Sequence, residues 1–243
     1  MIKQFSQSRI QVEKKPHPPS DFIPKNITIT AAGDSLTQGV GDSTKSGGYI
    51  PYLKKDLQSL KGVGTASFSN YGIQGNRTDQ LLSRLQSQSS LRKSISHSDA
   101  VIITIGGNDV MKVFEDHISD LKVGEFQTAI FGYEHRLQEL MKTIRTLNPH
   151  ASIILIGIYN PFMEWFSNVQ ELDEIVANWN NVSMQVVAGY KNAEFVPVYD
   201  IFNHHEKDLL YTDYFHPNDK GYKLIANRVF RYMQNKQIDV LTK

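Results

Sequence analysis

A serine stands at the end of a short run of β-forming residues near the start of the chain. In the segment 29–39, ITAAGDSLTQG, a strand would end in glycine and present Ser35 on a tight turn at its carboxyl end. The Gly-Asp-Ser triplet is also compatible with an ordinary turn. A serine hydroxyl attacks a carbonyl carbon only when a base takes its proton. Ser35 is therefore a candidate nucleophile that needs a base elsewhere in the chain.

Asp213 and His216 lie three residues apart, just before a predicted helix that a proline begins. Histidine is the natural base near neutral pH, and a carboxylate can hold its ring in the required tautomer. One turn of chain can place Asp213 against one ring nitrogen and leave the other nitrogen facing Ser35. The alternative is an aspartate that caps a turn beside a surface histidine. With eight histidines in the chain, both interpretations stay open at this point.

Glycine-rich segments at two other strand ends could stabilise an oxyanion. Gly72 and Gly75 follow the second predicted strand, and residues 106–109, GGND, follow the third. Glycines allow backbone N–H groups to approach a ligand closely, and Asn108 can add a side-chain N–H. Tight turns or a phosphate-binding edge would use similar residues. However, the chain contains no G-x-x-x-x-G-K-[ST] motif, and no G-x-G-x-x-G motif follows a strand.

The elements that must position these residues alternate along the chain. Apolar or alternating segments predict strands over residues 26–32, 65–71, 100–105, 152–158 and 194–198. Helical spacing predicts helices over residues 49–60, 125–147, 171–190 and 219–233, and another helix capped by Thr78. This alternation predicts a five-stranded parallel sheet with helices on both faces. Ligands bind such sheets at the carboxyl ends of the strands, where all the candidate residues would meet.

The composition describes an ordinary globular chain of 243 residues. We expect an extended, proline-containing arm over residues 1–25 and one domain over residues 26–243, because no linker divides the interior. The net charge of +1 argues against a broad nucleic-acid surface, and the absence of cysteine excludes disulfides and thiol catalysis. No apolar run reaches membrane-spanning length. An exported and a cytoplasmic protein fit the sequence equally, and the oligomeric state is not readable from it.

Four of these blocks, taken in order, resemble the GDSL (SGNH) family of lipases, esterases and acylhydrolases. They are residues 33–36 (GDSL), 70–75 (NYGIQG), 106–109 (GGND) and 213–216 (DYFH). The resemblance extends over residues 27–233 and is closest to the bacillus-type lipase/acylhydrolases, some of which are linked to phospholipid hydrolysis. It implies a three-layer α/β/α sandwich, similar to flavodoxin in outline, without a metal or cofactor.

By matched position, the resemblance assigns a role to each block. Ser35 would be the nucleophile, His216 the base and Asp213 the carboxylate that orients it. The oxyanion hole would consist of the Ser35 N–H, the Gly75 N–H and the Asn108 side chain, with Gly72 as a competitor for Gly75. The implied activity is that of a serine ester hydrolase that forms an acyl-serine intermediate.

The identity of the ester is a separate question. We expect an apolar acyl pocket or lid from the residues that follow the third and fourth strands, namely Val110, Met111, Phe114, Phe162 and Trp165. Their alternative role is to form part of the core at helix ends. The partner would be a small-molecule or lipid ester, including phospholipid or lysophospholipid. A carbohydrate or cell-wall O-acetylesterase is the enzymatic alternative, and a binding module on a flavodoxin-like sheet is the non-enzymatic one.

Overall fold

Five parallel strands form the centre of the protein in a computed structural model that describes residues 23–160 and 170–235. They are β1 (Lys25–Gly33), β2 (Val63–Gly72), β3 (Ala100–Thr104), β4 (Ser152–Ile156) and β5 (Ala193–Val196). The strand order is β2-β1-β3-β4-β5, and every neighbouring pair is parallel. This is the flavodoxin-like order, so the predicted five-stranded parallel sheet is confirmed.

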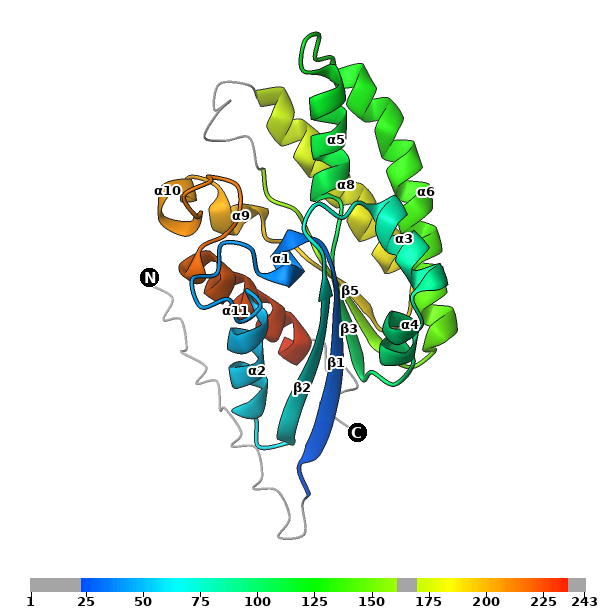
Figure 1. Cartoon of the computed structure of the whole chain (residues 1–243), viewed down its shortest axis with the longest axis vertical. Helices are drawn as coiled ribbons and strands as arrows, with labels where there is room; N and C mark the ends of the chain where they lie inside the picture. Colours follow the sequence, from blue (N-terminus) through cyan, green and yellow to red (C-terminus); the bar gives the residue numbers. More distant parts are fainter. Residues whose placement is uncertain (1–22, 161–169, 236–243) are drawn as a thin grey trace, which may run out of the picture.

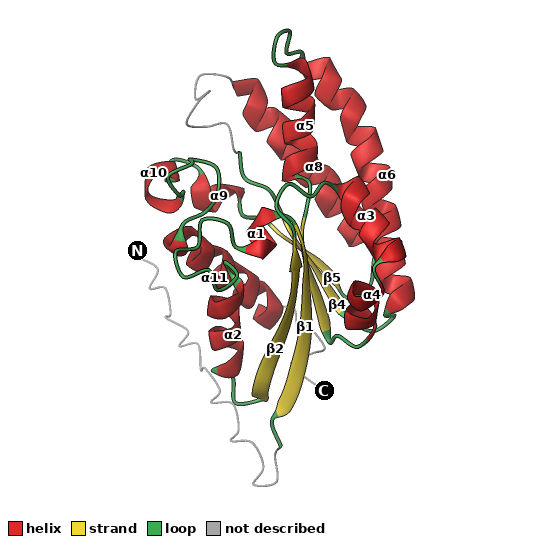
Figure 2. Cartoon of the chain, in the orientation of Figure 1, coloured by secondary structure: helices red, strands yellow, loops and turns green. Residues whose placement is uncertain are grey.

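Helices cover both faces of the sheet (Figures 1 and 2). One face carries α2 (Ile50–Gln58), α9 (Tyr199–Phe202), α10 (Glu206–Leu209) and α11 (Asp219–Asn235). The other carries α3 (Thr78–Ser87), α4 (Ser89–Ser96), α5 (Gly107–His117), α6 (Val123–Leu147) and α8 (Gln170–Ala188). The short helix α1 (Ser35–Gln38) lies at the strand tips. The expected α/β/α sandwich is therefore confirmed.

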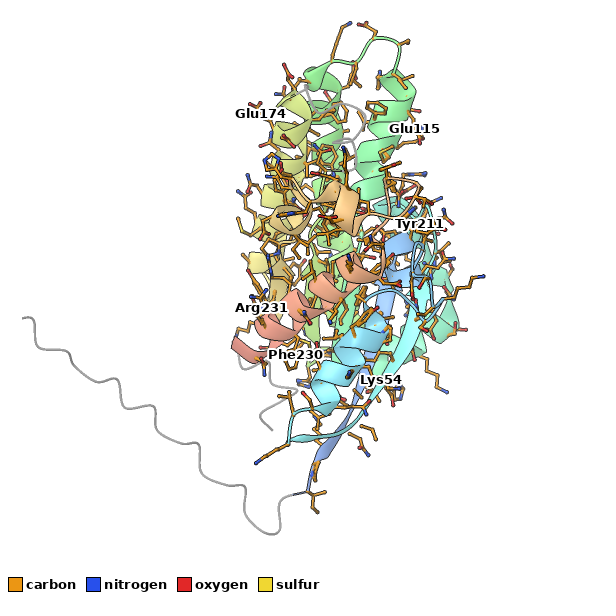
Figure 3. All side chains as sticks on the ribbon, turned by 90° about the vertical axis from the view of Figure 1, so that its left-hand side faces the viewer. Lys54, Glu115, Glu174, Tyr211, Phe230 and Arg231 are labelled. Atoms are coloured by element: carbon orange, nitrogen blue, oxygen red, sulfur yellow. The ribbon has the colours of Figure 1, made fainter. Side chains whose placement is uncertain are left out.

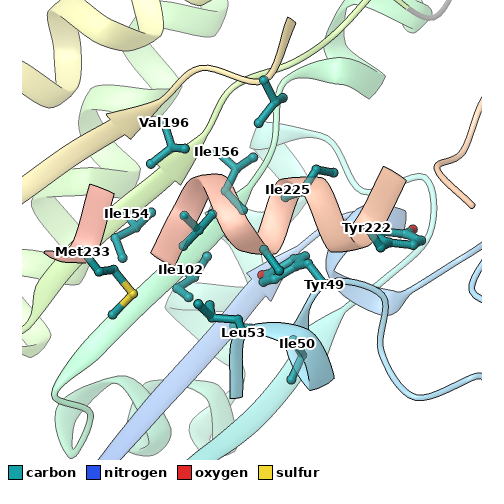
Figure 4. Packing of buried hydrophobic residues seen from close by; sticks show 14 of the residues in the cluster. Tyr49, Ile50, Leu53, Ile102, Ile154, Ile156, Val196, Tyr222, Ile225 and Met233 are labelled. Atoms are coloured by element: carbon teal, nitrogen blue, oxygen red, sulfur yellow. The ribbon is translucent and has the colours of Figure 1, made fainter. Parts of the chain in front are cut away.

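The two cores follow from the alternation of side chains along each strand. On β3, Ile102 packs with α2 and α11, whereas Ile103 packs with the helices of the opposite face. Figure 4 shows the first core, where Ile102 and Ile154 of the sheet lie close to Leu53 of α2 and Ile225 of α11. Successive strand residues point to opposite faces, so a strand covered on both sides must be apolar at every position.

The second core extends past the sheet toward the carboxyl ends of the strands. Helices α5, α6 and α8 continue beyond the strand tips (Figure 1). In the view turned by 90°, Glu115 of α5 and Glu174 of α8 mark this end, while Lys54 of α2 and Arg231 of α11 lie nearer the opposite end (Figure 3). The loops that were expected to meet at the carboxyl edge are therefore flanked by helices that rise on one side of it.

Helix starts differ from the predictions in two places. Thr78 is not the N-cap of α3 but its first residue, because its N–H and hydroxyl both donate to the buried Asp109 Oδ2 at 2.9 Å. The N-cap is Arg77, whose N–H donates to Gln80 Oε1. Pro217 does not begin the last helix either. Asn218 Oδ1 caps that helix by accepting the N–H groups at positions 220 and 221.

The remaining differences are short elements and chain ends. The helices α1, α4, α5, α9 and α10 were not predicted, since most span too few residues to show a helical period. Residues 1–22 of the expected arm lie outside the described residues, and β1 already begins at Lys25. The expected division into an arm and a single domain stays a prediction.

Candidate active site

Ser35 is the first residue of α1, directly after β1. Asp34 caps this helix by accepting the Leu36 N–H at 3.0 Å, and Gly39 ends it in a left-handed conformation with φ 92°. Gly33 is needed before the turn, because a Cβ at that position would lie 2.0 Å from the Thr104 carbonyl oxygen. The expected tight turn is therefore one turn of capped helix, which places the serine N–H at the helix N-terminus.

The polar atoms of Ser35 are available to a ligand. Neither its hydroxyl nor its backbone N–H makes a hydrogen bond to residues 23–160 or 170–235. The residue as a whole is only 2% exposed, so a substrate can reach it only through the cavity beside it. An unpaired hydroxyl next to an unpaired N–H is the arrangement that a nucleophile with an adjacent oxyanion donor requires.

Asp213 and His216 are joined by a hydrogen bond. His216 Nδ1 lies 2.7 Å from Asp213 Oδ2, and Asp213 Oδ1 accepts the N–H groups of Phe215 and His216 at 3.0 Å. Burial opposes the ionisation of Asp213, but these hydrogen bonds outweigh it and lower its pKa. Because an ionised carboxylate only accepts, Nδ1 carries the proton and Nε2 is free to act as a base. His216 is 7% exposed, which decides against a surface histidine.

The loop after α1 packs against the loop that carries His216. The Tyr222 hydroxyl donates to the Val40 carbonyl at 2.6 Å, and a Cβ on Gly41 would lie 2.5 Å from the Pro217 carbonyl oxygen. On the other side, the Tyr159 hydroxyl donates to the Phe215 carbonyl at 2.5 Å. These contacts bring the segments that carry Ser35 and His216 together, although they lie at opposite ends of the chain.

Asp42 organises the loop between them. Its carboxylate accepts the Thr44 N–H and hydroxyl, the Ser46 N–H and the Gly48 N–H at 2.6 to 3.1 Å. Sequence reasoning missed this role. The four glycines over residues 39–48, all with positive φ in the structure, were the signal that the backbone turns sharply there.

The predicted oxyanion donors lie along one connected segment. Ile73 N–H donates to the Gly33 carbonyl, and Asn108 Nδ2 donates one hydrogen to the Asn76 carbonyl at 2.9 Å. The Gly75 N–H makes no hydrogen bond to the described residues, and a Cβ there would meet nothing within 4 Å. The Gly72 N–H is already bonded to Asn70 Oδ1, which favours Gly75 over Gly72 as a donor. The functional roles of these residues stay predictions.

Asp109 anchors the helix that follows Asn108. Its Oδ2 accepts both hydrogen bonds from Thr78, and its Oδ1 lies 3.2 Å from Arg136 Nη2. Burial raises its pKa, against the opposing effect of these donors. Sequence reasoning did not identify this buried pair, which ties α5 to α3 and α6 beside the candidate oxyanion donor.

Asp34 is a second buried carboxyl that sequence reasoning missed. The Thr104 hydroxyl donates to its Oδ1 at 2.7 Å, and Thr37 and Tyr49 extend the buried network at 2.8 and 3.1 Å. Burial raises the pKa of Asp34 to about 7. The carboxyl next to the candidate nucleophile therefore changes charge near neutral pH.

A narrow cavity of about 30 Å³ opens beside Ser35, between the ends of β3 and β4. Its walls are Asp34, Ser35, Leu36, Thr104, Ile105, Gly107, Asn108, Ile156, Gly157, Ile158, Tyr159 and Phe215. Val110, Met111 and Phe114, expected to line an acyl pocket, are not among them. Val110 and Phe114 are buried in the second core, and Met111 packs against it. For these three residues the structure gives the core placement. Phe162 and Trp165 lie outside the described residues.

Two further features were searched for within residues 23–160 and 170–235. No group of three His, Asp or Glu side chains there could hold a metal ion. No helix there is both long enough and apolar enough to cross a membrane.

Comparison with known proteins places this geometry in a family. Residues 31–224 match the GDSL-like Lipase/Acylhydrolase family. The protein YpmR of Bacillus subtilis, which is uncharacterised, is 38% identical over 214 residues, covering 87% of this chain and 83% of its own.

Two solved structures share the fold. The lipase Lip_vut3 from a goat rumen metagenome superposes with a TM-score of 0.75 at 22% identity, over 84% of this chain and 95% of that one. Axe2 from Geobacillus, an acetyl-xylooligosaccharide esterase, superposes with a TM-score of 0.64 at 23% identity, over 86% and 95%. The chain belongs to the GDSL-like lipase/acylhydrolase family and is a carboxylic ester hydrolase.

Proposed function

We propose that the protein hydrolyses carboxylic esters through an acyl-serine intermediate on Ser35, with His216 as the base and Asp213 as its orienting carboxylate. The observation that carries this proposal is the 2.7 Å bond between His216 Nδ1 and Asp213 Oδ2 on a buried histidine. That bond holds the ring in the tautomer whose Nε2 can accept a proton. The packing of the Ser35 and His216 loops against each other supports the pairing.

In the acylation step, His216 Nε2 takes the Ser35 proton while Oγ bonds to the ester carbonyl carbon. The carbonyl oxygen becomes an anion, and the Ser35 N–H, the Gly75 N–H and the free Asn108 Nδ2 hydrogen stabilise it. As the tetrahedral intermediate collapses, the carbon–alkoxy bond breaks and the imidazolium gives its proton to the leaving alcohol. Water then attacks the acyl-serine by the same route, which releases the acid and restores Ser35.

The natural ester is the second part of the proposal. The long-chain lipid alternative depended on an apolar pocket formed by residues after the third and fourth strands, and the described members of that set face the core. The narrow cavity favours the other alternative, an esterase for short acyl groups such as O-acetyl groups on a carbohydrate. The structural neighbour Axe2 is named as an acetyl-xylooligosaccharide esterase, which agrees with this choice. The family assignment leaves no reason to retain the binding-module alternative.

Hydrolysis of p-nitrophenyl esters from acetyl to palmitoyl, by wild type and Ser35→Ala, tests the mechanism. We expect turnover on the shorter esters and a loss of roughly 10⁶-fold in kcat in the variant, as for a removed nucleophile. An organophosphonate should label the wild type once and leave Ser35→Ala unlabelled. Labelling of Ser35→Ala at another site with turnover intact would refute the assignment of the nucleophile.

A further inference from the structure

We infer that the cavity between the ends of β3 and β4 is the acyl site of this protein, and that Ile158 and Gly107 set the length of the acyl chain it accepts. This inference rests on the proposed function. It goes beyond that function by naming the residues that decide between short and long esters. The argument uses the position of the cavity, its size and the way its wall is fixed.

The position of the cavity suits the acyl side of the ester. Ser35 and Asn108 both lie on its wall, so a carbonyl carbon held between them stands at its mouth. The leaving oxygen must face His216, because that residue protonates it. Among the described residues, the lining set includes Phe215 but not His216. The cavity therefore extends from the carbonyl carbon in a direction other than that of the leaving group, which is where the acyl substituent projects.

The size and chemistry of the cavity suit a small apolar group. Its volume of about 30 Å³ equals roughly the share of one water molecule in the liquid. Most of its wall is apolar, with side chains of Leu36, Ile105, Ile156, Ile158, Tyr159 and Phe215. The polar atoms at its floor are already engaged, since the Thr104 hydroxyl bonds to Asp34 and Thr37. A methyl or ethyl group would fill it, whereas a longer chain would need the wall to move.

Ile158 forms a part of that wall that cannot move easily. The Asn180 side chain holds its backbone on both sides, accepting the Ile158 N–H at 2.9 Å and donating to its carbonyl at 2.8 Å. Truncating the Ile158 side chain should therefore enlarge the cavity and not shift the loop. The backbone clamp explains why a residue after the end of β4 can act as a fixed boundary.

Gly107 forms the opposite wall and faces Ile158. A Cβ placed on Gly107 would lie 3.8 Å from Ile158 Cγ2, at ordinary contact distance and without a clash. An alanine would therefore fit and would take up space between the two residues. The pair allows opposite tests, because Ile158→Ala widens the cavity and Gly107→Ala narrows it.

The experiment measures kcat/KM on p-nitrophenyl acetate, butyrate, hexanoate and octanoate for wild type and both variants, with active sites counted by organophosphonate labelling. We expect the wild type to prefer acetate or butyrate. Ile158→Ala should raise the octanoate-to-acetate ratio by about tenfold or more, and Gly107→Ala should lower the butyrate-to-acetate ratio several-fold. Ile118→Ala provides the matched control, because it removes the same atoms from a side chain that is 65% exposed on the far end of α5.

The ratios separate an acyl wall from a structural role, since a misfolded fraction lowers all four esters equally. Ratios unchanged in both variants would overturn the inference, as would a shift of equal size in Ile118→Ala. If Ile158→Ala does not fold, Gly107→Ala still supplies the narrowing test. Failure of the proposed function looks different, because turnover would then survive in Ser35→Ala.

Discussion

Two carboxyl groups flank the candidate nucleophile, and their surroundings push them in opposite directions. Asp34, in the turn after β1, is 4% exposed, and burial raises its pKa to about 7. The Asp213 side chain, in the loop before α11, is 39% exposed, and its hydrogen bonds lower its pKa despite the partial burial. The same residue type therefore serves two purposes within one site.

The difference lies in what each carboxyl receives. Asp213 accepts two backbone N–H groups and the imidazole, all of which favour its charged form. Asp34 accepts one hydroxyl and one backbone N–H, but burial dominates. Only Asp213 is suited to steady an imidazolium at neutral pH. Asp34 is suited to cap α1 and to support the turn that presents Ser35.

The largest expected effect comes from neutralising each carboxyl in turn. Asp213→Asn should lower kcat by roughly 10³- to 10⁴-fold, because the amide favours the wrong histidine tautomer. Asp34→Asn should lower kcat less than about tenfold at pH 6, because asparagine resembles the protonated acid that is already present there. Steady-state kinetics on a short p-nitrophenyl ester compares the two. A loss in Asp34→Asn as large as that in Asp213→Asn would break the contrast.

Asn108→Ala should have the next largest effect. Removing one oxyanion donor costs about 3 kcal/mol of transition-state stabilisation, or about 10²-fold in kcat. Organophosphonate labelling should remain possible in this variant, unlike in Ser35→Ala, because the nucleophile and base are intact. An unchanged kcat would remove Asn108 from the oxyanion hole and leave only the two backbone donors.

The raised pKa of Asp34 predicts a pH-dependent stability. Between its ordinary value of 3.8 and about 7, the folded state binds more protons than the unfolded state. The free energy of unfolding should therefore fall as the pH rises through this window. The contribution is roughly 3 kcal/mol between pH 5 and pH 8, at about 1.4 kcal/mol per pKa unit. Urea unfolding at both pH values should show this difference in the wild type and a smaller one in Asp34→Asn. Equal slopes would show that another group is responsible.

Gly41→Ala should have the smallest effect and would test the contact between the two regions. Its φ of 90° costs about 1–2 kcal/mol for a residue with a side chain. The new Cβ would also press against the Pro217 carbonyl oxygen, one residue after His216. We therefore expect lower stability in urea unfolding together with a several-fold drop in kcat. A loss of stability with kcat unchanged would show that the His216 loop tolerates displacement.

The predicted and observed features differ in kind. Ala100 to Thr104 was predicted as a buried strand because its unbroken apolar run needs no knowledge of its neighbours. Thr78 was assigned as a cap because local rules favour threonine there, but Asp109, thirty-one residues away, takes its hydroxyl. Val110 and Phe114 were considered for a pocket because they follow a strand end, and only the packing of α5 against the second core shows that they are buried.

The sequence by itself determined the alternation of strands and helices, the parallel sheet and the order of the four motif blocks. Those features depend on side-chain periodicity and on turn residues, which act over a few positions. The tertiary structure alone decided the opposite pKa shifts of Asp34 and Asp213, the donor status of Gly75 and the boundary formed by Ile158 and Gly107. These depend on contacts between segments far apart in the chain, such as Thr104 with Asp34 and Tyr222 with Val40. Burial and hydrogen bonding are properties of the assembled site, and no local pattern records them.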